Sequence, residues 1–163
     1  MLSLVLICGP AWSTNSEKGE VPQVLYVVPF LNVMIPENVS TNLFDRFIDE
    51  MMTAGEAHSI KVRILKQDID AVDREWLGQQ YFVTGELFDY DRESGCCSTE
   101  LEARARIYYY RPGSVDPFTE ITVSGDAFFD HDLSSLSEEQ ARMGSDMAGK
   151  LSSSLIFKIV PVR

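Results

Sequence analysis

The sequence has few of the residues and motifs on which enzymes most often depend. It contains two histidines and three cysteines among 163 residues. It has no Gly-x-Ser-x-Gly nucleophile elbow, no glycine-rich phosphate loop and no His-Glu-x-x-His motif. His58 and His131 have no third or fourth ligand at the spacing of a familiar metal site. We therefore predict a protein that is not an enzyme and that uses neither a metal nor a cofactor.

Basic residues are also scarce. The chain has 14 Lys and Arg against 25 Asp and Glu, a formal net charge of −11 and a sequence pI near 4.5. Such a charge repels phosphate backbones and anionic lipid headgroups, which excludes nucleic acid and bare membrane surfaces as expected partners. A hydrophobic share of 45% is ordinary for a globular protein, and the length favours one domain.

The apolar stretch at the start of the chain is too short for a spanning helix, which needs about 20 residues. It runs from Leu2 to Cys8 and is followed by Gly9-Pro10 and Ala11-Trp12-Ser13. An apolar run, a helix break and small residues together form the pattern of a secretory signal peptide, although no Lys or Arg precedes the run here. We predict that residues 1–13 are removed and that the mature protein has no transmembrane span.

The remainder divides into a polar leader, residues 14–22, and a single domain, residues 23–163. Lipidation of Cys8 is the alternative to cleavage after Ser13. Ile7 stands directly before Cys8, where a bacterial lipobox has a small residue, so cleavage is the preferred interpretation. Either route predicts an exported protein.

The first half of the domain alternates strand and helix. Gln23–Leu31 is a short apolar run typical of a buried strand that Pro29 ends. Helical spacing of apolar residues begins after Ser40 or Thr41, either of which is a suitable N-cap, and Gly55 is expected to stop this helix. Residues 59–66 alternate as in a half-buried strand, and residues 70–78 predict one or two helical turns.

The second half predicts a three-strand antiparallel meander followed by a long helix. The strands are residues 81–90, 99–111 and 117–128, with a turn in Asp-Arg-Glu-Ser-Gly between the first two. Ser137 and Gln140 form a capping-box pattern for the final helix. Its buried stripe is expected to be Met143, Met147, Leu151 and Leu155, with Ala148, Gly149 and Ser152 allowing close approach to the sheet. The predicted fold is α/β (α+β), a mixed sheet with two main helices on one face and no second core.

Alternation in residues 99–111 divides the side chains between two faces. Leu101, Ala103, Ala105, Ile107 and Tyr109 are expected to face the core. Arg104, Arg106, Tyr108 and Tyr110 then lie on the other face, and Tyr and Arg are the residues that most often anchor interfaces. We predict a partner-binding surface there. Cross-strand pairing of Arg104 or Arg106 with Glu120 explains the same residues equally well.

Cys96-Cys97 stands between the predicted turn and the second strand of the meander. Adjacent Cα atoms are about 3.8 Å apart, below the usual disulfide range of about 4.4–6.8 Å, so a bridge between them is strained. Two free thiols and an intermolecular bridge are the alternatives. The nearby Asp89, Asp91, Glu93 and Glu100 have the spacing of ligand positions in a calcium-binding loop. However, Ser94 stands where the loop requires glycine, and strands are predicted where it has flanking helices. A solvated hairpin is therefore favoured.

Two segments resemble a fold shared by bacterial envelope proteins. Val27-Val28-Pro29-Phe30 before a helix is similar to the opening of this fold, and Tyr81–Leu87, an aromatic strand with a central glycine, is similar to its signature. The fold occurs in the curli secretion-channel protein, the lipoprotein activators of penicillin-binding proteins and the N-terminal domain of the Tol–Pal translocation protein. Gln80 stands where the signature has an acidic residue. The resemblance implies an accessory or assembly domain and transfers no catalytic residue.

We therefore predict a periplasmic or outer-membrane-associated protein that binds another envelope protein, with homo-oligomerisation left open. One alternative is a small-molecule or metal-binding module that uses Cys96, Cys97 and nearby carboxylates. The other is a hydrolase whose residues come together from distant positions, which a deep pocket containing His131 and carboxylates would indicate.

Overall fold

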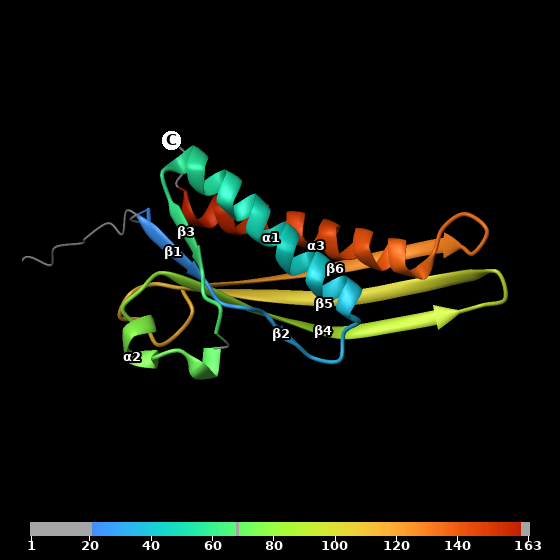
Figure 1. Ribbon diagram of the computed structural model, residues 1–163, viewed down its shortest axis with the longest axis horizontal. Helices are drawn as coiled ribbons and strands as arrows, with labels where there is room; N and C mark the ends of the chain where they lie inside the picture. Colours follow the sequence, from blue (N-terminus) through green and yellow to red (C-terminus); the bar gives the residue numbers. More distant parts are fainter. Residues whose placement is uncertain (1–20, 68, 161–163) are drawn as a thin grey trace, which may run out of the picture.

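The structure, a computed structural model, describes residues 21–67 and 69–160. The elements along the chain are β1 (Val24–Val27), β2 (Leu31–Asn32), α1 (Glu37–His58), β3 (Lys61–Ile64), the 3₁₀ turn η1 (Ile69–Ala71), α2 (Arg74–Leu77), β4 (Phe82–Ser94), β5 (Ser98–Tyr110), β6 (Thr119–Asp130) and α3 (Leu136–Ile159). They form a mixed six-stranded sheet in the order β3-β1-β4-β5-β6, with β2 beside β4. Helices α1 and α3 lie together over one face, and α2 lies on the other (Figure 1). The predicted fold class is confirmed.

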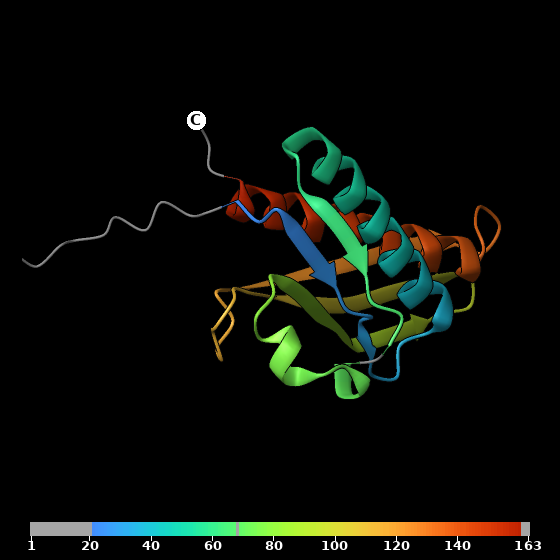
Figure 2. The same ribbon diagram turned by 60° about the vertical axis from the view of Figure 1, so that its left-hand side comes forward.

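Pro29 divides the apolar run Gln23–Leu31 into two strands. β1 pairs in parallel with both β3 and β4, and the Val28 N–H then donates to Val83 O at 2.8 Å. Proline has no N–H with which to continue this ladder. Pairing with β4 resumes only at β2 (Figure 2). The prediction that Pro29 ends the strand pairing is confirmed.

Helix α1 begins earlier than the sequence indicated. Its N-cap is Pro36, which makes no side-chain capping hydrogen bond, so the predicted caps Ser40 and Thr41 are wrong. The Ser40 hydroxyl instead donates to Glu37 O inside the first turn, at 3.1 Å. Serine hydroxyls bond in this way to a preceding carbonyl as readily as they cap, which is why the sequence pattern misplaced the start.

Gly55 does not end α1, contrary to prediction. The helix continues to His58, and Ser59 takes the left-handed φ of 60° that a helix C-cap often adopts. A Cβ on Gly55 would lie 2.6 Å from Ile60 O. The glycine therefore does not end the helix. It leaves room for the backbone at Ile60, which passes close to α1 just before β3.

A small second hydrophobic cluster lies on the sheet face that α1 and α3 leave open. Asp73 caps α2, because its carboxylate accepts the backbone N–H groups of Glu75 and Trp76. This cap fixes the short helical segment predicted at residues 70–78 and directs Leu77 onto the sheet. The cluster consists of Val28, Val72, Leu77 and Phe82. The prediction of no second core is wrong, since the connection from β3 to β4 covers the apolar end of this face.

The meander strands are longer than predicted. Four of the five residues assigned to the turn continue β4, and the turn is formed by Gly95, Cys96 and Cys97. Gly95 N–H donates to Ser98 O at 2.8 Å and closes it. The β4–β5 register shifts between Phe88 and Asp91, where Asp89 has a φ of 59°. This irregularity is a β-bulge, which turns the end of β4 relative to its start.

Helix α3 starts at Leu136, two residues earlier than the predicted cap implies. Ser135 is the N-cap and Glu138 completes a capping box, so the prediction of Ser137 with Gln140 is wrong. Both pairs have the same spacing, and the structure selects between them through Gln140. Its side chain is buried and its amide nitrogen donates to the Tyr90 hydroxyl of β4 at 2.8 Å, so this side chain joins the helix to the sheet.

The main core lies between the sheet and the two long helices. The five β5 residues predicted to face inward are all buried, and so are the four residues of the α3 stripe. Burial raises the pKa of Tyr109 to about 12. On β6, a Cβ at Gly125 would lie 2.6 Å from the Met147 side chain, so the absence of a side chain at this glycine leaves room for Met147 of α3.

The small residues of α3 face α1 more than the sheet, contrary to prediction. A Cβ added to Gly144 would lie 2.6 Å from Val39 O, and one added to Gly149 would find Glu50 nearest, at 3.7 Å. The Ser152 hydroxyl donates to the Glu50 carboxylate. These contacts set the spacing of the helix pair. Among the described residues, no helix has both the length and the apolar character to cross a membrane.

We expect Gly144→Ala to destabilise the protein by about 1–3 kcal/mol, because the new methyl group meets rigid backbone of α1. Gly149→Ala is the matched control on the same helix. It meets only an ordinary contact and should stabilise by roughly 0.5–1 kcal/mol through helix propensity. Urea unfolding followed by circular dichroism measures both changes. Equal stabilisation by the two alanines would show that α1 and α3 are further apart than described.

Candidate partner-binding face of the meander

The face of β4, β5 and β6 that points away from α1 and α3 is here called the outer face. Burial alternates along β5 as the sequence predicted, with Leu101, Ala105 and Ile107 inside. Arg104 is exposed on the outer face, and Arg106 and Tyr108 are half-buried there. The predicted division of β5 into two faces is therefore confirmed, while its use as a binding surface stays a prediction.

Arg106 is the centre of a network on the outer face. Its guanidinium donates to Glu86 at 2.6 and 2.9 Å and to Glu120 at 3.0 Å, which ties together all three meander strands. It also lies over the rings of Phe88 and Tyr108, at 5.0 and 5.5 Å from their centres. The Tyr108 hydroxyl donates to Glu86 at 3.1 Å. The cross-strand pair that the sequence offered as an alternative, Arg106 with Glu120, is present.

This network holds its side chains in fixed positions. Hydrogen bonds to Glu120 and Glu86 raise the pKa of Arg106. Burial raises the pKa of Tyr108, with a further contribution from its bond to Glu86. Two carboxylates share one guanidinium, so Arg106 is committed within the protein and is not a free cation. A partner would meet a preformed aromatic and polar platform.

Tyr110 lies outside this platform. Its ring stacks on Phe82 at 4.4 Å with the planes 5° apart, and it packs against the second cluster near α2. Burial raises the pKa of its hydroxyl. The strand alternation places Tyr110 on the outer side as expected, but the connection around α2 covers that end of the sheet. Of the four predicted residues, Arg104, Arg106 and Tyr108 stay together on the open part.

The end of the outer face nearest the β4–β5 turn is acidic. Asp91 pairs directly with Glu102, and Glu93 pairs directly with Glu100. On its other side Glu102 faces Asp126 of β6. Like charges directly opposite one another destabilise a sheet. In the described part of the chain, the ion pairs on this face are those of Arg106 and the Arg104–Asp89 pair at 3.2 Å.

The sequence carried a signal for this acidic end that was interpreted differently. In the sequence, Asp91, Glu93 and Glu100 have the spacing of calcium-loop positions and predict a solvated hairpin. They do lie on a hairpin, and strands flank them. Recognising the patch required the β4–β5 register, which depends on the bulge at Phe88–Asp91 and on a turn four residues later than expected. Within residues 21–67 and 69–160 no group of three or more ligand-type side chains is placed to hold a metal ion.

The turn at the acidic end brings Cys96 and Cys97 together with His131. The two sulfur atoms are 3.2 Å apart, and both cysteines are free and exposed. His131 N–H donates to Cys97 O at 2.9 Å, and its Nε2 is hydrogen-bonded to Thr99 Oγ1 at 2.8 Å. The hairpin is thereby tied to the start of the loop before α3. This contact gives His131 a structural role.

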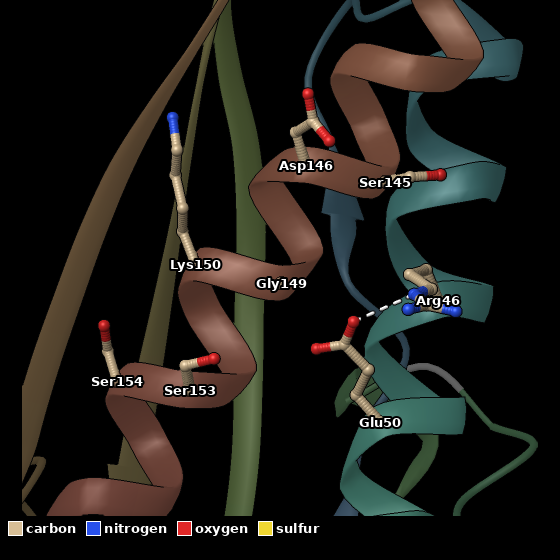
Figure 3. Close-up of a pocket in the computed structure, with 8 residues that line it drawn as sticks. All are labelled: Arg46, Glu50, Ser145, Asp146, Gly149, Lys150, Ser153 and Ser154. Carbon is tan, nitrogen blue, oxygen red and sulfur yellow. Dashed lines mark hydrogen bonds and ion pairs between the residues drawn. The ribbon is translucent and has the colours of Figure 1, made fainter.

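A groove of about 860 Å³ runs between α1 and α3 and is open to solvent (Figure 3). Arg46 and Glu50 of α1 form an ion pair at 2.8 Å on one side, and three serines of α3 lie on the other. Lys150, also in the groove, donates from Nζ to Ser124 O of β6 at 2.9 Å. Neither of the two histidines lines the groove. The groove is therefore not the pocket of His131 and carboxylates that the hydrolase alternative predicts.

Comparison with known proteins identifies the fold. The sequence matches no protein-family model and no curated protein. Among solved structures, lipoprotein GNA1162 from Neisseria meningitidis superposes with a TM-score of 0.53 and 15% identity, over 85% of this chain and 98% of that one. The hypothetical protein CT253 from Chlamydia trachomatis gives 0.54 and 12%, over 83% and 96%.

A PelC dodecamer from Paraburkholderia phytofirmans gives a TM-score of 0.51 and 14% identity, over 81% of this chain and 90% of that one. At such identities the likeness shows the fold alone. The chain thus has a fold that a bacterial lipoprotein also adopts. The narrower resemblance to the curli, penicillin-binding-protein-activator and Tol–Pal proteins stays a proposal.

We expect Glu102→Gln to raise the free energy of unfolding by about 0.2–1 kcal/mol, because Glu102 is opposed by a carboxylate on each side. The gain should shrink as salt is added, since salt screens exposed charges. Glu56→Gln, an exposed glutamate of α1, is the control and should leave stability unchanged. A loss of stability in Glu102→Gln would show that the carboxylates on the outer face do not repel one another.

Proposed function

We propose that this chain is an exported, non-catalytic accessory protein of the bacterial cell envelope, and that it binds another envelope protein through the outer face of the meander. One observation carries the proposal: carboxylates of β4, β5 and β6 stand directly opposite one another on an exposed face. Such an arrangement costs folding free energy. A partner that brings Lys or Arg side chains to this face recovers that cost on binding.

The Arg106 network supplies the second half of the proposed surface. The Arg106 guanidinium lies over the rings of Phe88 and Tyr108. Aromatic and Arg side chains that are already fixed in place contribute most to interface energy, because little conformational entropy is lost on binding. The partner surface that fits is therefore basic over the acidic end and has an apolar or aromatic contact at the platform.

The acidic face argues for a different protein as partner, and against a second copy meeting face to face. Two copies would place like-charged carboxylates together, and each chain carries a formal net charge of −11. One structure of the same fold is a dodecamer, so self-association through other surfaces is an outcome that the experiments below distinguish.

Export is the second part of the proposal. The supporting observations are the signal-peptide pattern of residues 1–13 and a fold also found in a bacterial lipoprotein. Residues 1–20 lie outside the described residues, so both the cleavage after Ser13 and the alternative lipidation of Cys8 stay proposals. The resemblance of Val27–Phe30 and of Tyr81–Leu87 to envelope assembly proteins points to the same compartment.

We expect a photo-reactive residue at Thr122 or at Glu102 to crosslink one discrete partner in living cells. Both positions lie on the outer face, at the platform and at the acidic end. The same residue at Ser153, exposed on α3, is the control and should give no such product. Mass spectrometry identifies the crosslinked protein. A product from Ser153 alone would move the binding surface to the helices.

Purified partner then tests the proposed chemistry. Glu102→Lys should weaken binding at least tenfold, and added salt should weaken binding of the unchanged protein, because the attraction is electrostatic. Glu56→Lys makes the same charge change on α1 and should bind normally. Equal effects of the two reversals would indicate a general charge effect and contradict a local acidic contact.

We expect the protein isolated from its native host to lack residues 1–13. Intact-mass measurement decides among the alternatives. A mature chain that begins at Thr14 supports cleavage by signal peptidase, and a lipid-modified chain that begins at Cys8 supports the lipoprotein route. A chain that retains Met1 without modification would contradict export by either route.

A further inference from the structure

The β4–β5 turn presents two neighbouring thiols to solvent. Cys96 and Cys97 occupy the centre of the turn that Gly95 and Ser98 close. Their sulfur atoms lie 3.2 Å apart, within hydrogen-bonding distance for thiols and on the same side of the turn. Both side chains are exposed, so a dissolved reagent or another protein reaches them without any rearrangement.

The turn holds this pair in place from both sides. Strand pairing continues to Ser94 and Thr99 on the two flanks. The Cys97 carbonyl accepts the His131 N–H at 2.9 Å, and His131 is fixed in turn by Thr99. The hydrogen bond with Cys96 raises the pKa of the Cys97 thiol, and burial and Asp130 add to this effect. The pair is therefore held as two protonated thiols, one of which donates a hydrogen bond to the other sulfur.

We propose that Cys96 and Cys97 form a thiol–disulfide exchange site, whose substrates are the disulfides of small thiols or of other proteins. This inference does not depend on the proposed partner-binding face. A bond between adjacent cysteines is strained, because their Cα atoms are about 3.8 Å apart, less than ordinary disulfides prefer. Strained and exposed disulfides are the ones that are readily reduced again. The pair consequently suits reversible exchange better than permanent crosslinking.

The exchange proceeds in two balanced steps. One cysteine loses its proton and attacks a sulfur of the substrate disulfide, which forms a mixed disulfide and releases the first substrate thiolate. The second cysteine, also deprotonated, attacks the protein sulfur of that mixed disulfide and releases the second thiolate. Cys96 and Cys97 are oxidised to one internal disulfide, and the substrate disulfide is reduced to two thiols. The two protons pass to the departing thiolates.

Once the mixed disulfide has formed, attack by the second cysteine of the same chain is expected to be faster than reaction with another molecule. The neighbouring sulfur is already 3.2 Å away, so its effective concentration far exceeds that of any dissolved thiol. Glu93 and Glu100 flank the turn, which disfavours the approach of a second copy carrying the same charges. Disulfide-linked dimers are therefore the less favoured product.

We test the site in the full chain with Cys8→Ser in every sample, so that Cys96 and Cys97 are the only thiols. Reduced protein is equilibrated with mixtures of reduced and oxidised glutathione, quenched in acid and weighed by mass spectrometry. We expect a species lighter by two hydrogens. Its formation should depend on the square of the reduced glutathione concentration, so that about tenfold more reduced glutathione requires about a hundredfold more oxidised glutathione.

The single variants Cys96→Ser and Cys97→Ser are the matched controls. Each should stop at a protein carrying one glutathione, with a simple first-power dependence on reduced glutathione. Two results would overturn the proposal: a two-cysteine protein that accumulates glutathione on both sulfurs, or one that is converted mainly to disulfide-linked dimers. Circular dichroism of both variants should match the parent, because the substitutions are isosteric and exposed.

Discussion

The two-residue repeat of β5 is the constraint on which both the core and the candidate surface depend. β5 is paired along nearly its whole length with β4 on one side and β6 on the other. Its inward residues complete the core beneath α1 and α3, so that face carries apolar side chains, apart from Thr99 near the turn. Every charged residue of the strand is thereby placed on the outer face. A change of register by one residue would exchange the two sets and abolish both the core and the charged surface.

The charges of the outer face are arranged unevenly as a result. Near the middle of the strands, one guanidinium lies between two carboxylates and two aromatic rings. Toward the turn, Asp91, Glu93, Glu100 and Glu102 line one hollow. Natural sheets commonly place opposite charges across from one another, because that arrangement is the stable one. The departure at the acidic end is the type of local conflict that functional surfaces retain at some cost to stability.

Some of this arrangement follows from the sequence, and some of it does not. Element order and the inward face of β5 follow, because hydrophobic periodicity records which side of a strand or helix is buried. The helix starts do not: Ser135 and Ser137 both fit a capping box, and only the burial of Gln140 selects the first. The acidic pairs of the site depend on a bulge, and the second cluster depends on how Val72 and Leu77 reach the sheet. Such long-range contacts leave no local pattern to read.

The hydrogen bond from Lys150 to Ser124 has a consequence for how the protein behaves at high concentration. Among the described strands β6 pairs only with β5, so the other edge of this twelve-residue strand has no strand partner. An open edge of this length invites further strands to add and to grow into aggregates. The ammonium group occupies one edge carbonyl near the middle of β6, so an incoming strand must displace a charged side chain before it can pair. Lys150 of α3 thereby disfavours the addition of further strands to the β6 edge.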